Sequence, residues 1–556
     1  MLMVPTTRRR FAAECGALRW LESGGGSVQV HLVVFEAWNI SRFIFVTNKR
    51  REIAGASELI TYLERTWVRT AVEDLFPGFE DRWRIETEPV EILETGAGTA
   101  KVLVRDQTSA RNLVRAVTTA ALRDAPGLEV CGVVGEPFDW SAEGALHASL
   151  GRTAERLAPV RTALPGPDAR FLRLPVVAGC ASTGLPAESM VWLPDGSEPR
   201  SAESRAKWRA YGRQTEGDGL QRLAKLAGVT TRELAQVVDH LNDHAEWVGV
   251  VYADGNGLGP VFGNFEACVE DRSNRQYADT LRTFSATLQS CARDAFADAV
   301  HALEGLGARL EHGPVPLLPL ILGGDDLVAL CSGDWALPFT EAYLRAFEKR
   351  TAMTRDLVGP LSRQGKRGLS ACAGVAIVKP HFPFSASRDL AYDLMLEAKH
   401  VKNAVEGPCS ALSFHVLYDS SEADLDRIRA RGTGPDAAHI NAQPYVVSDV
   451  PEECQWTRGR RWGDLTRRVT ALAARDDEGE RHLPASQLHD LRQALFLGRS
   501  VADARFGSLL PRYPDLEQLD EGQGSLFWRE TGSGSEITGF LDALDAAAFL
   551  VEGRTP

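Results

Sequence analysis

The chain has 556 residues, too many for one hydrophobic core, so three or four domains are expected. Hydrophobic residues make up 44% and charged residues 25%, which is ordinary for a soluble protein, and no apolar run is long enough to span a membrane. The net charge of −13 argues against a chain that grips a long nucleic-acid backbone by itself. We therefore expect a cytoplasmic protein without membrane contact whose substrate is a small anion neutralised by metal ions.

The nine cysteines are scattered along the chain, and none forms a C-x-x-C pair. A disulfide framework is therefore not expected, nor is a complete zinc site of four cysteines. Most of the cysteines are expected to be small buried hydrophobic residues.

The chain begins with a segment, residues 1–26, that ends in three glycines and is expected to be disordered. Residues 27–140 then form the first copy of a repeated pattern. Alternating and β-rich residues predict strands, and apolar residues at helical spacing predict helices. The expected elements are strands at 28–35 and 42–47, a helix at 55–76, a hairpin at 90–104 around Gly96-Ala97-Gly98, a helix at 109–123 and a strand at 128–134.

Residues 141–245 are a mixed linker domain, largely helical from 203 to 242. The second copy occupies residues 246–420, and residues 421–556 are expected to be a helical domain with helices such as 486–497 and 537–550. The second copy is expected to contain a strand at 247–252, a long amphipathic helix with Leu281 to Leu303 on its apolar face, a hairpin of 317–322 and 327–331, a helix at 339–357, a strand at 369–378, a helix at 386–403 and a strand at 410–417.

Both copies share the order strand, helix, hairpin, helix, strand. That order is the ferredoxin-like split βαβ arrangement of polymerase palms, so the fold class is α+β with two palm-like domains. The hairpin of the first copy has no carboxylate at Gly96-Ala97-Gly98, whereas the second has two aspartates. We therefore expect one active palm, the second, and one structural palm.

The second hairpin carries the chemistry at Gly323-Gly324-Asp325-Asp326. Glycines allow a sharp turn and close approach of a ligand. Two adjacent carboxylates near apolar strands repel each other unless a cation neutralises them, and Mg²⁺ prefers a few carboxylates together with phosphates and water. Taken alone, the same residues are equally typical of a solvated turn.

Asp254 strengthens the catalytic interpretation. It follows a hydrophobic strand, in a loop that continues with Gly255-Asn256-Gly257. In a palm the first strand lies beside the hairpin, so Asp254 is expected to reach the same two ions as Asp325 and Asp326. The amides of Gly255, Asn256 and Gly257 are expected to form an anion nest for phosphate oxygens.

Lys399 and Lys402 lie three residues apart on a helix and so share a face, from which they can neutralise phosphates. Two solvated lysines are the competing interpretation, and the catalytic role is favoured more for Lys399. His489-Asp490 lies in a helical segment without companion residues and is expected to be structural. Cys180 lacks the further thiols that a zinc ribbon needs.

These motifs resemble the large polymerase-like subunit of type III CRISPR effector complexes. The similarity rests on Tyr-Ala-Asp-Gly-Asn-Gly-Leu-Gly at 252–259, Gly-Gly-Asp-Asp at 323–326, and Lys-Pro-His-Phe-Pro at 379–383 with the helix 390–399. In the first copy, Phe43-Ile44-Phe45 through Arg51 to Ile60 is similar to the family's opening segment. The palm also resembles that of the GGDEF cyclases, whose helix lysine matches Lys399 of this chain.

The resemblance implies a cyclase that joins ATP 3′-to-5′ into cyclic oligoadenylates for antiphage defence. It implies that Asp254, Asp325 and Asp326 bind two Mg²⁺ or Mn²⁺ ions and that the glycine loop with Gly323 and Gly324 seats the triphosphate. Protein partners of an RNA-guided complex are implied, with RNA held mainly by them. No HD nuclease domain is evident, so DNA cleavage is not expected. A silent scaffold subunit and a stand-alone cyclic-nucleotide synthase remain alternatives, and a diguanylate cyclase is less expected.

Overall fold

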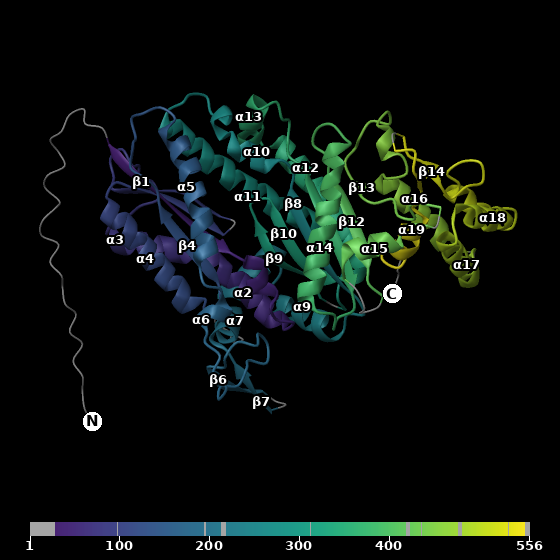
Figure 1. The fold of residues 1–556 in the computed structure, drawn as a ribbon, viewed down its shortest axis with the longest axis horizontal. Coiled ribbons are helices and arrows are strands. Elements are labelled where there is room, and N and C mark those ends of the chain that lie inside the picture. The colour runs from purple at the N-terminus through teal and green to yellow at the C-terminus, as the bar shows by residue number, and fades with distance from the viewer. Residues whose placement is uncertain are drawn as a thin grey trace, which may run out of the picture.

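The computed structural model describes residues 28–96, 98–193, 196–212, 218–311, 313–418, 423–434, 436–475, 481–531 and 533–550. Two sheets with their helices and a group of C-terminal helices follow one another along the long axis (Figure 1). The expected α+β class is confirmed. The segment 1–26 and Ala97 lie outside the described residues.

The first sheet has the strand order β2-β3-β1-β4, with antiparallel neighbours throughout and β5 beside β1. This is the ferredoxin-like arrangement expected for the first copy. Its elements are β1 (Gln29–Trp38), α1 (Ile40–Phe45), α2 (Arg50–Tyr62), the π-helix η1 (Leu63–Trp67), α3 (Val68–Leu75), β2 (Val90–Gly96), β3 (Thr99–Val104), α4 (Gln107–Asp124), β4 (Glu129–Val134) and β5 (Phe138–Asp139).

The strand expected at 42–47 is wrong, because the short helix α1 occupies this place. Phe43, Ile44 and Phe45 are all buried, so the segment has no exposed face that would distinguish a strand from a helix by alternation. Asn39 precedes the helix in the left-handed region, with a φ of 51°. That residue turns the chain away from the sheet at the end of β1.

Between the sheets, residues 203–242 are largely helical where they are described, as expected. The helices α7 and α8 pack against α2 of the first copy, and the hairpin β6–β7 projects from the body (Figure 1). The elements are α5 (Ala145–Ala163), α6 (Pro167–Arg170), β6 (Ser189–Leu193), β7 (Gly196–Arg200), α7 (Ala202–Tyr211), α8 (Asp218–Ala227) and α9 (Thr231–Asp243).

The second sheet has the order β13-β12-β11-β8-β10-β9, in which the last four strands repeat the topology of the first sheet. The strand β12 adds to it in parallel with β11. The elements are β8 (Val248–Gly255), α10 (Leu258–Gly263), η2 (Phe265–Cys268), α11 (Asn274–Gly305), β9 (Leu317–Gly323), β10 (Asp326–Ser332), α12 (Gly333–Met353), α13 (Arg355–Arg363), β11 (Ala371–Val378), α14 (Phe384–Ala398), η3 (Lys399–Asn403), β12 (Ala411–Val416) and β13 (Tyr445–Val446).

The C-terminal residues are mostly helical. The helix expected at 486–497 is present as α17, whereas the one expected at 537–550 is shorter and begins only after β15. None of the described helices combines the length and apolar character that a membrane span requires. The elements are α15 (Leu425–Arg431), η4 (Gln455–Thr457), α16 (Trp462–Ala473), α17 (Ala485–Phe496), α18 (Arg499–Leu509), η5 (Pro514–Leu519), β14 (Trp528–Arg529), β15 (Glu536–Ile537) and α19 (Phe540–Ala546).

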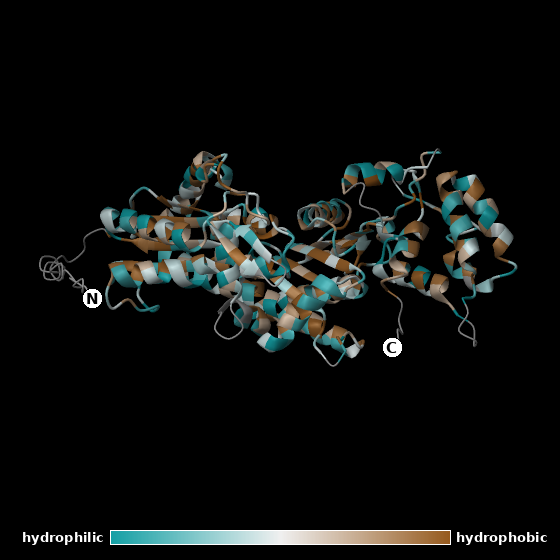
Figure 2. Cartoon of the chain, turned by 90° about the horizontal axis from the view of Figure 1, so that it is seen from below, coloured by the Kyte–Doolittle hydropathy of each residue, from teal (hydrophilic) through white to brown (hydrophobic). Residues whose placement is uncertain are grey.

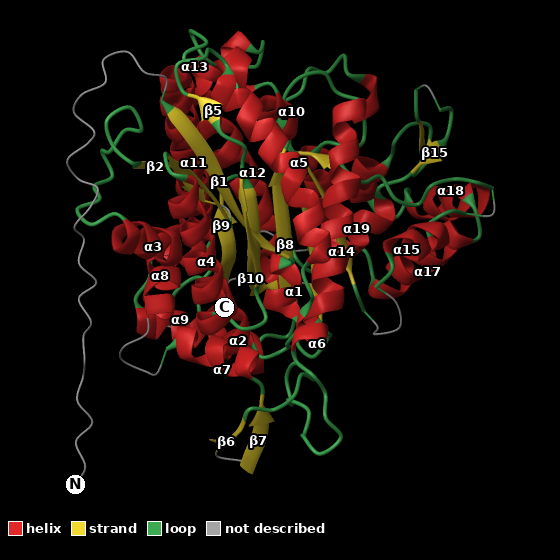
Figure 3. Ribbon diagram, turned by 60° about the vertical axis from the view of Figure 1, so that its left-hand side comes forward, coloured by secondary structure: helices red, strands yellow, loops and turns green. Residues whose placement is uncertain are grey.

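Apolar stretches run along the strands and on the helix faces beside them (Figure 2), and helices flank the strands (Figure 3). The apolar face expected for the long helix is confirmed, since Leu281, Phe284, Leu288, Cys291 and Leu303 of α11 are all buried. The helix packs on α12 and also reaches β2 of the first copy and α5 of the segment between the sheets. It therefore ties the two palm-like units together.

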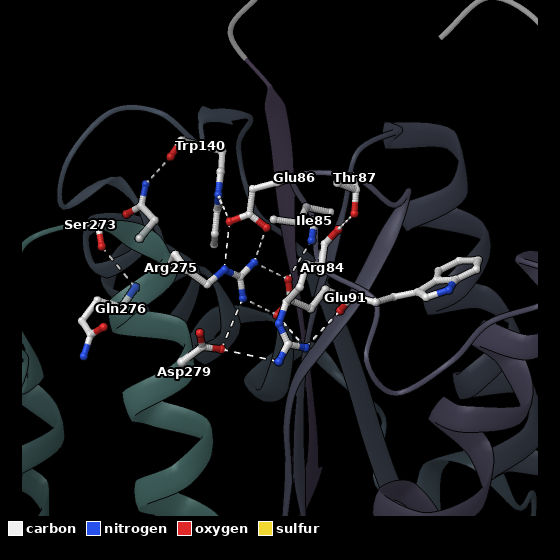
Figure 4. Close-up of polar contacts among 12 residues, drawn as sticks. Arg84, Ile85, Glu86, Thr87, Glu91, Trp140, Ser273, Arg275, Gln276 and Asp279 are labelled. Carbon is white, nitrogen blue, oxygen red and sulfur yellow. Dashed lines mark hydrogen bonds and ion pairs between the residues drawn. The ribbon is translucent and has the colours of Figure 1, made fainter. Parts of the chain in front are cut away.

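A group of ion pairs reinforces this connection (Figure 4). Arg275 of α11 donates hydrogen bonds to Glu86 and to the buried Glu91 of β2. Arg282, two turns further along the same helix, also donates to Glu91. The indole of Trp140 donates to Glu86 at 2.8 Å. Charges from both copies thus neutralise each other at a contact that fixes α11 against the first sheet.

Candidate active site

Asp254 belongs to the central strand of the second sheet. The sequence placed it in a loop beyond the strand, but β8 continues to Gly255 because it pairs with β11 up to that residue. Asp254 lies opposite Cys372 of β11, and the preceding Ala253 lies opposite Leu327 of β10. The register therefore puts the Asp254 carboxylate on a rigid strand next to the β9–β10 turn.

The turn between β9 and β10 brings two further carboxylates to the same place. Gly324 adopts a φ of 64°, and Asp326 is the first residue of β10, paired with Gly323. Asp325 lies directly against β8 at Gly255. A Cβ built on Gly255 would lie 2.6 Å from the Asp325 Cβ, so only glycine accommodates this approach.

The three aspartates are close enough to perturb one another. Burial and then the charge of Asp254 raise the pKa of Asp325 to about 6, although the Gly255 amide donates to it. Burial, Asp325 and Asp254 raise the pKa of Asp326 well above its usual range, and Asp326 shares a hydrogen bond with Asp254. Like charges in a poorly solvated place favour protonation unless a cation is present.

Lys399 supplies a cation in this structure. It begins η3, directly after α14, and its ammonium forms an ion pair with Asp254. Lys402 lies one turn further along and is exposed. In the described part of the chain, no group of three or more His, Cys, Asp or Glu side chains is already arranged to hold a metal ion. The donor chemistry at Asp254, Asp325 and Asp326 suits Mg²⁺, but an incoming ion would compete with the Lys399 ammonium for Asp254.

The expected anion nest in the glycine loop is wrong in its proposed form. The Asn256 amide donates to the Ser370 carbonyl at 2.7 Å, and the Gly255 amide faces Asp325. The Asn256 side chain is also used within the fold, since its Nδ2 donates to the Cys409 carbonyl at 3.1 Å. These hydrogen bonds hold the loop against the neighbouring segments. Of the three amides proposed for the nest, only that of Gly257 is left to bind a phosphate oxygen.

Two cavities flank the β9–β10 hairpin, one on each side, between the two palm-like units. The first, of about 420 Å³, contains Gly324 and Asp325 together with parts of β2, β3 and α11. The second, of about 480 Å³, contains Gly323 and Asp326 together with parts of α2, α8 and α11. Gln289 of α11 borders both. The hairpin thus has space for a ligand on either side.

The second cavity contains residues that the sequence did not single out. Four cationic side chains border it, namely Arg65, Arg222, Lys225 and Arg293. Glu64 also lines it and accepts a hydrogen bond from the Gly98 amide at 3.0 Å. Glu64 lies in the π-helix η1, and π-helical turns are frequent at functional sites. These residues are spread over three distant segments, so no local motif indicates that they meet.

Comparisons with known proteins agree with this geometry. Residues 247–406 match the family model described as Cas10/Cmr2, second palm domain, while no curated protein matches the chain significantly. Csm1 from T. onnurineus is similar with a TM-score of 0.52 at 12% identity, covering 94% of this chain and 69% of that one. A Csm1-Csm4 cassette in complex with one ATP gives a TM-score of 0.51 at 12% identity, covering 94% and 70%.

A third solved structure, a Csm1-Csm4 cassette in complex with pppApApA, gives a TM-score of 0.50 at 13% identity, with 94% and 69% covered. At such identities, similarity to solved structures establishes the fold alone. The family match covers β8, the hairpin and the helix that precedes Lys399, which are the elements that build the site. The resemblance seen in the sequence is confirmed: residues 247–406 form a second palm domain of the Cas10/Cmr2 family, in a chain with the fold of Csm1.

Proposed function

We propose that this protein is a metal-dependent nucleotidyltransferase that joins ATP 3′-to-5′ into cyclic oligoadenylates. The observation that carries the proposal is the meeting of Asp254, Asp325 and Asp326 beside two cavities at the palm-palm boundary. A reaction between two nucleotides needs room for both on either side of the reacting atoms. The related Csm1-Csm4 structures are described in complex with ATP and with oligoadenylates, which supports an adenine substrate.

The charges around the hairpin suit a nucleoside triphosphate. Arg65, Arg222, Lys225 and Arg293 make the rim of the second cavity cationic, which favours a polyphosphate there. Asp326 lines the same cavity. We infer that the rim binds the phosphates of one nucleotide while the other cavity holds the second nucleotide.

Asp254, Asp325 and Asp326 would hold the divalent ions, Mg²⁺ or Mn²⁺. Bound there, such ions neutralise phosphate charge and lower the pKa of an attacking hydroxyl. The protein's own contribution is to fix Asp254 on β8, and to fix Asp325 and Asp326 at the turn where β10 begins. Lys399 keeps the charge of Asp254 balanced before the substrate arrives, and its ammonium is then free to contact a phosphate.

The proposal is tested by incubating the purified full chain with ATP and Mg²⁺ or Mn²⁺, with and without partner subunits and target RNA. Cyclic or linear oligoadenylates and pyrophosphate are expected, and Asp325→Asn should abolish them. Substitution of the exposed Glu136 is the matched control, because it also removes one carboxylate. Glu136 lies outside the two hairpin cavities, so synthesis should stay intact. Absence of any product under all these conditions would refute the enzyme and favour the scaffold alternative.

We also propose that the chain works with protein partners, because the Csm1 relatives are described as Csm1-Csm4 cassettes. An acidic chain of net charge −13 is suited to leave most RNA contacts to such partners. Synthesis that depends on a partner subunit and target RNA would support assembly in an RNA-guided complex. Constitutive synthesis by the isolated chain would instead favour the stand-alone synthase.

A further inference from the structure

A separate cavity, remote in sequence from the hairpin, lies where the second sheet meets the C-terminal helices. Its volume is about 290 Å³. Strand β12 and the residues after it, α15, α17 and α19 all contribute to its walls. The candidate active site does not use any of these elements, so the cavity needs an explanation of its own.

One wall carries a carboxyl group that the protein does not satisfy. Asp545 of α19 has a buried oxygen, Oδ1, without a hydrogen-bond partner. Arg492 of α17 points a nitrogen at this oxygen, but their separation of 3.9 Å is too long for a hydrogen bond. The Tyr418 hydroxyl bonds to the same carboxyl group. Buried polar atoms are nearly always paired, so an open acceptor facing a cavity indicates a missing partner.

Two other charged groups that line the cavity, Asp542 and Arg429, have hydrogen-bond partners within the protein. Asp542 accepts hydrogen bonds from the Ala442 amide, the Gln443 side chain and the Tyr445 hydroxyl. Arg429 forms a bidentate pair with Glu397 on α14, at 2.7 and 2.8 Å. The Asp545 oxygen differs from these two groups, because it is buried without a hydrogen-bond partner.

Aromatic and uncharged groups border the same space. Phe496 and Tyr418 both line the cavity, and their exposed fractions are 45% and 51%. Burial followed by the nearby Arg429 lowers the pKa of His415 to about 4, so this imidazole is neutral at physiological pH. A flat ligand would find rings to stack on, a carboxylate acceptor, and a guanidinium donor beside it.

We propose that this cavity binds a purine nucleotide at a site separate from the catalytic hairpin. The Asp545 oxygen accepts from an amino or ring N–H of the purine, and Arg492 donates to a neighbouring ring or phosphate acceptor. Such pairs match the way carboxylates and arginines recognise base edges in general. Phe496 stacks on the base. The volume accommodates a mononucleotide, which can be free or the end of an RNA strand.

The test is calorimetric titration of the full chain with GMP and AMP, and with CMP and UMP, in EDTA. Without divalent ions, the monophosphates have little affinity for the catalytic carboxylates. A purine monophosphate is expected to bind, and Asp545→Ala is expected to weaken this binding by at least about tenfold, since the buried acceptor for the base N–H is lost and that N–H is left unpaired. Gln493→Ala, an exposed position on the same helix as Arg492, should leave binding unchanged.

Phe496→Ser provides a second variant that tests the same site. Its side chain is nearly half exposed, so the substitution should leave folding intact while weakening purine binding severalfold. Asp325→Asn should have no effect on this binding. If a purine-ended RNA trimer binds more tightly than GMP or AMP, the natural ligand is an RNA end. If the trimer and the mononucleotides bind equally, the natural ligand is a free nucleotide. No purine binding at millimolar concentration, or binding insensitive to both cavity variants, overturns the proposal.

Discussion

Glu91 is expected to be a main determinant of the connection between the two palms, and Glu91→Gln tests this. Its side chain is 1% exposed and accepts hydrogen bonds from the Ile85 amide, from Arg275 at 2.8 Å, and from Arg282. Glutamine keeps the size of the side chain but loses the charge and one acceptor oxygen. The two arginines of α11 would then face an uncharged partner at a buried place.

The expected loss of unfolding free energy depends on which acidic partners Arg275 and Arg282 still contact in the variant. Breaking a buried ion pair by removing one partner costs about 3–5 kcal/mol. Arg275 still contacts Glu86 and Arg282 still contacts Asp279, so the lower end, about 3 kcal/mol, is expected for Glu91→Gln. The matched control is Glu86→Gln, because Glu86 shares Arg275 but its side chain is 36% exposed. An exposed pair of this kind contributes at most about 1 kcal/mol.

Urea unfolding followed by circular dichroism measures both variants. Burial alone would raise the pKa of Glu91, but the hydrogen bonds from Arg275 and Ile85 outweigh it and leave the pKa below its usual value. A carboxylate with a lowered folded-state pKa stabilises the fold above its unfolded-state pKa, and this contribution is lost as pH falls through the folded-state value. The difference between wild type and Glu91→Gln should therefore shrink in acid. Equal losses for the two variants near neutral pH would refute the reasoning.

Three further changes have definite expected outcomes. Gly255→Ala should reduce product formation at least about tenfold by displacing the first aspartate of the hairpin, whereas Gly259→Ala, whose Cβ meets nothing within 4 Å, should not. Lys399→Ala should tighten Mg²⁺ binding in calorimetry yet lower synthesis, while the exposed Lys402→Ala should change neither. The pKa of His415 is lowered to about 4 in the folded protein, so between pH 6.5 and 4 this imidazole binds a proton mainly in the unfolded chain. The free energy of unfolding should therefore fall by up to about 3 kcal/mol as the pH decreases through that range. His415→Gln should flatten this part of the urea-stability profile.

Much of the fold follows from local patterns in the sequence. Hydrophobic alternation placed β1, apolar segments placed β4 and β11, and the glycine turns marked both hairpins. The repeated order of elements then predicts the strand order, because a split βαβ unit has few ways to close its sheet. The apolar face of α11 was equally visible, since it recurs at helical spacing over eight turns.

The details of the site depend on contacts between distant segments. Whether Asp254 lies in a strand or a loop is decided by how far β11 continues beside it. Whether the Asn256 amide is free is decided by the position of Ser370, more than a hundred residues away. Glu64 of η1 and Arg293 of α11 line one cavity, although they lie far apart in the sequence. None of these outcomes has a signature within a short window of sequence.

The two hairpins show why a duplicated fold has one candidate catalytic centre. In the first copy, a glutamate from the adjoining helix, Glu64, satisfies the amide of Gly98 at the hairpin tip, so the turn is stable without any ligand. In the second copy the tip itself carries Asp325 and Asp326, whose raised pKa values reflect unrelieved repulsion and burial. Lys399 pairs directly with Asp254, and its charge also lowers the pKa of Asp325 and of Asp326, yet both pKa values stay raised. We therefore expect a divalent cation with its bound phosphates to bind at the second hairpin, where burial and mutual repulsion keep the pKa values of two carboxyl groups raised.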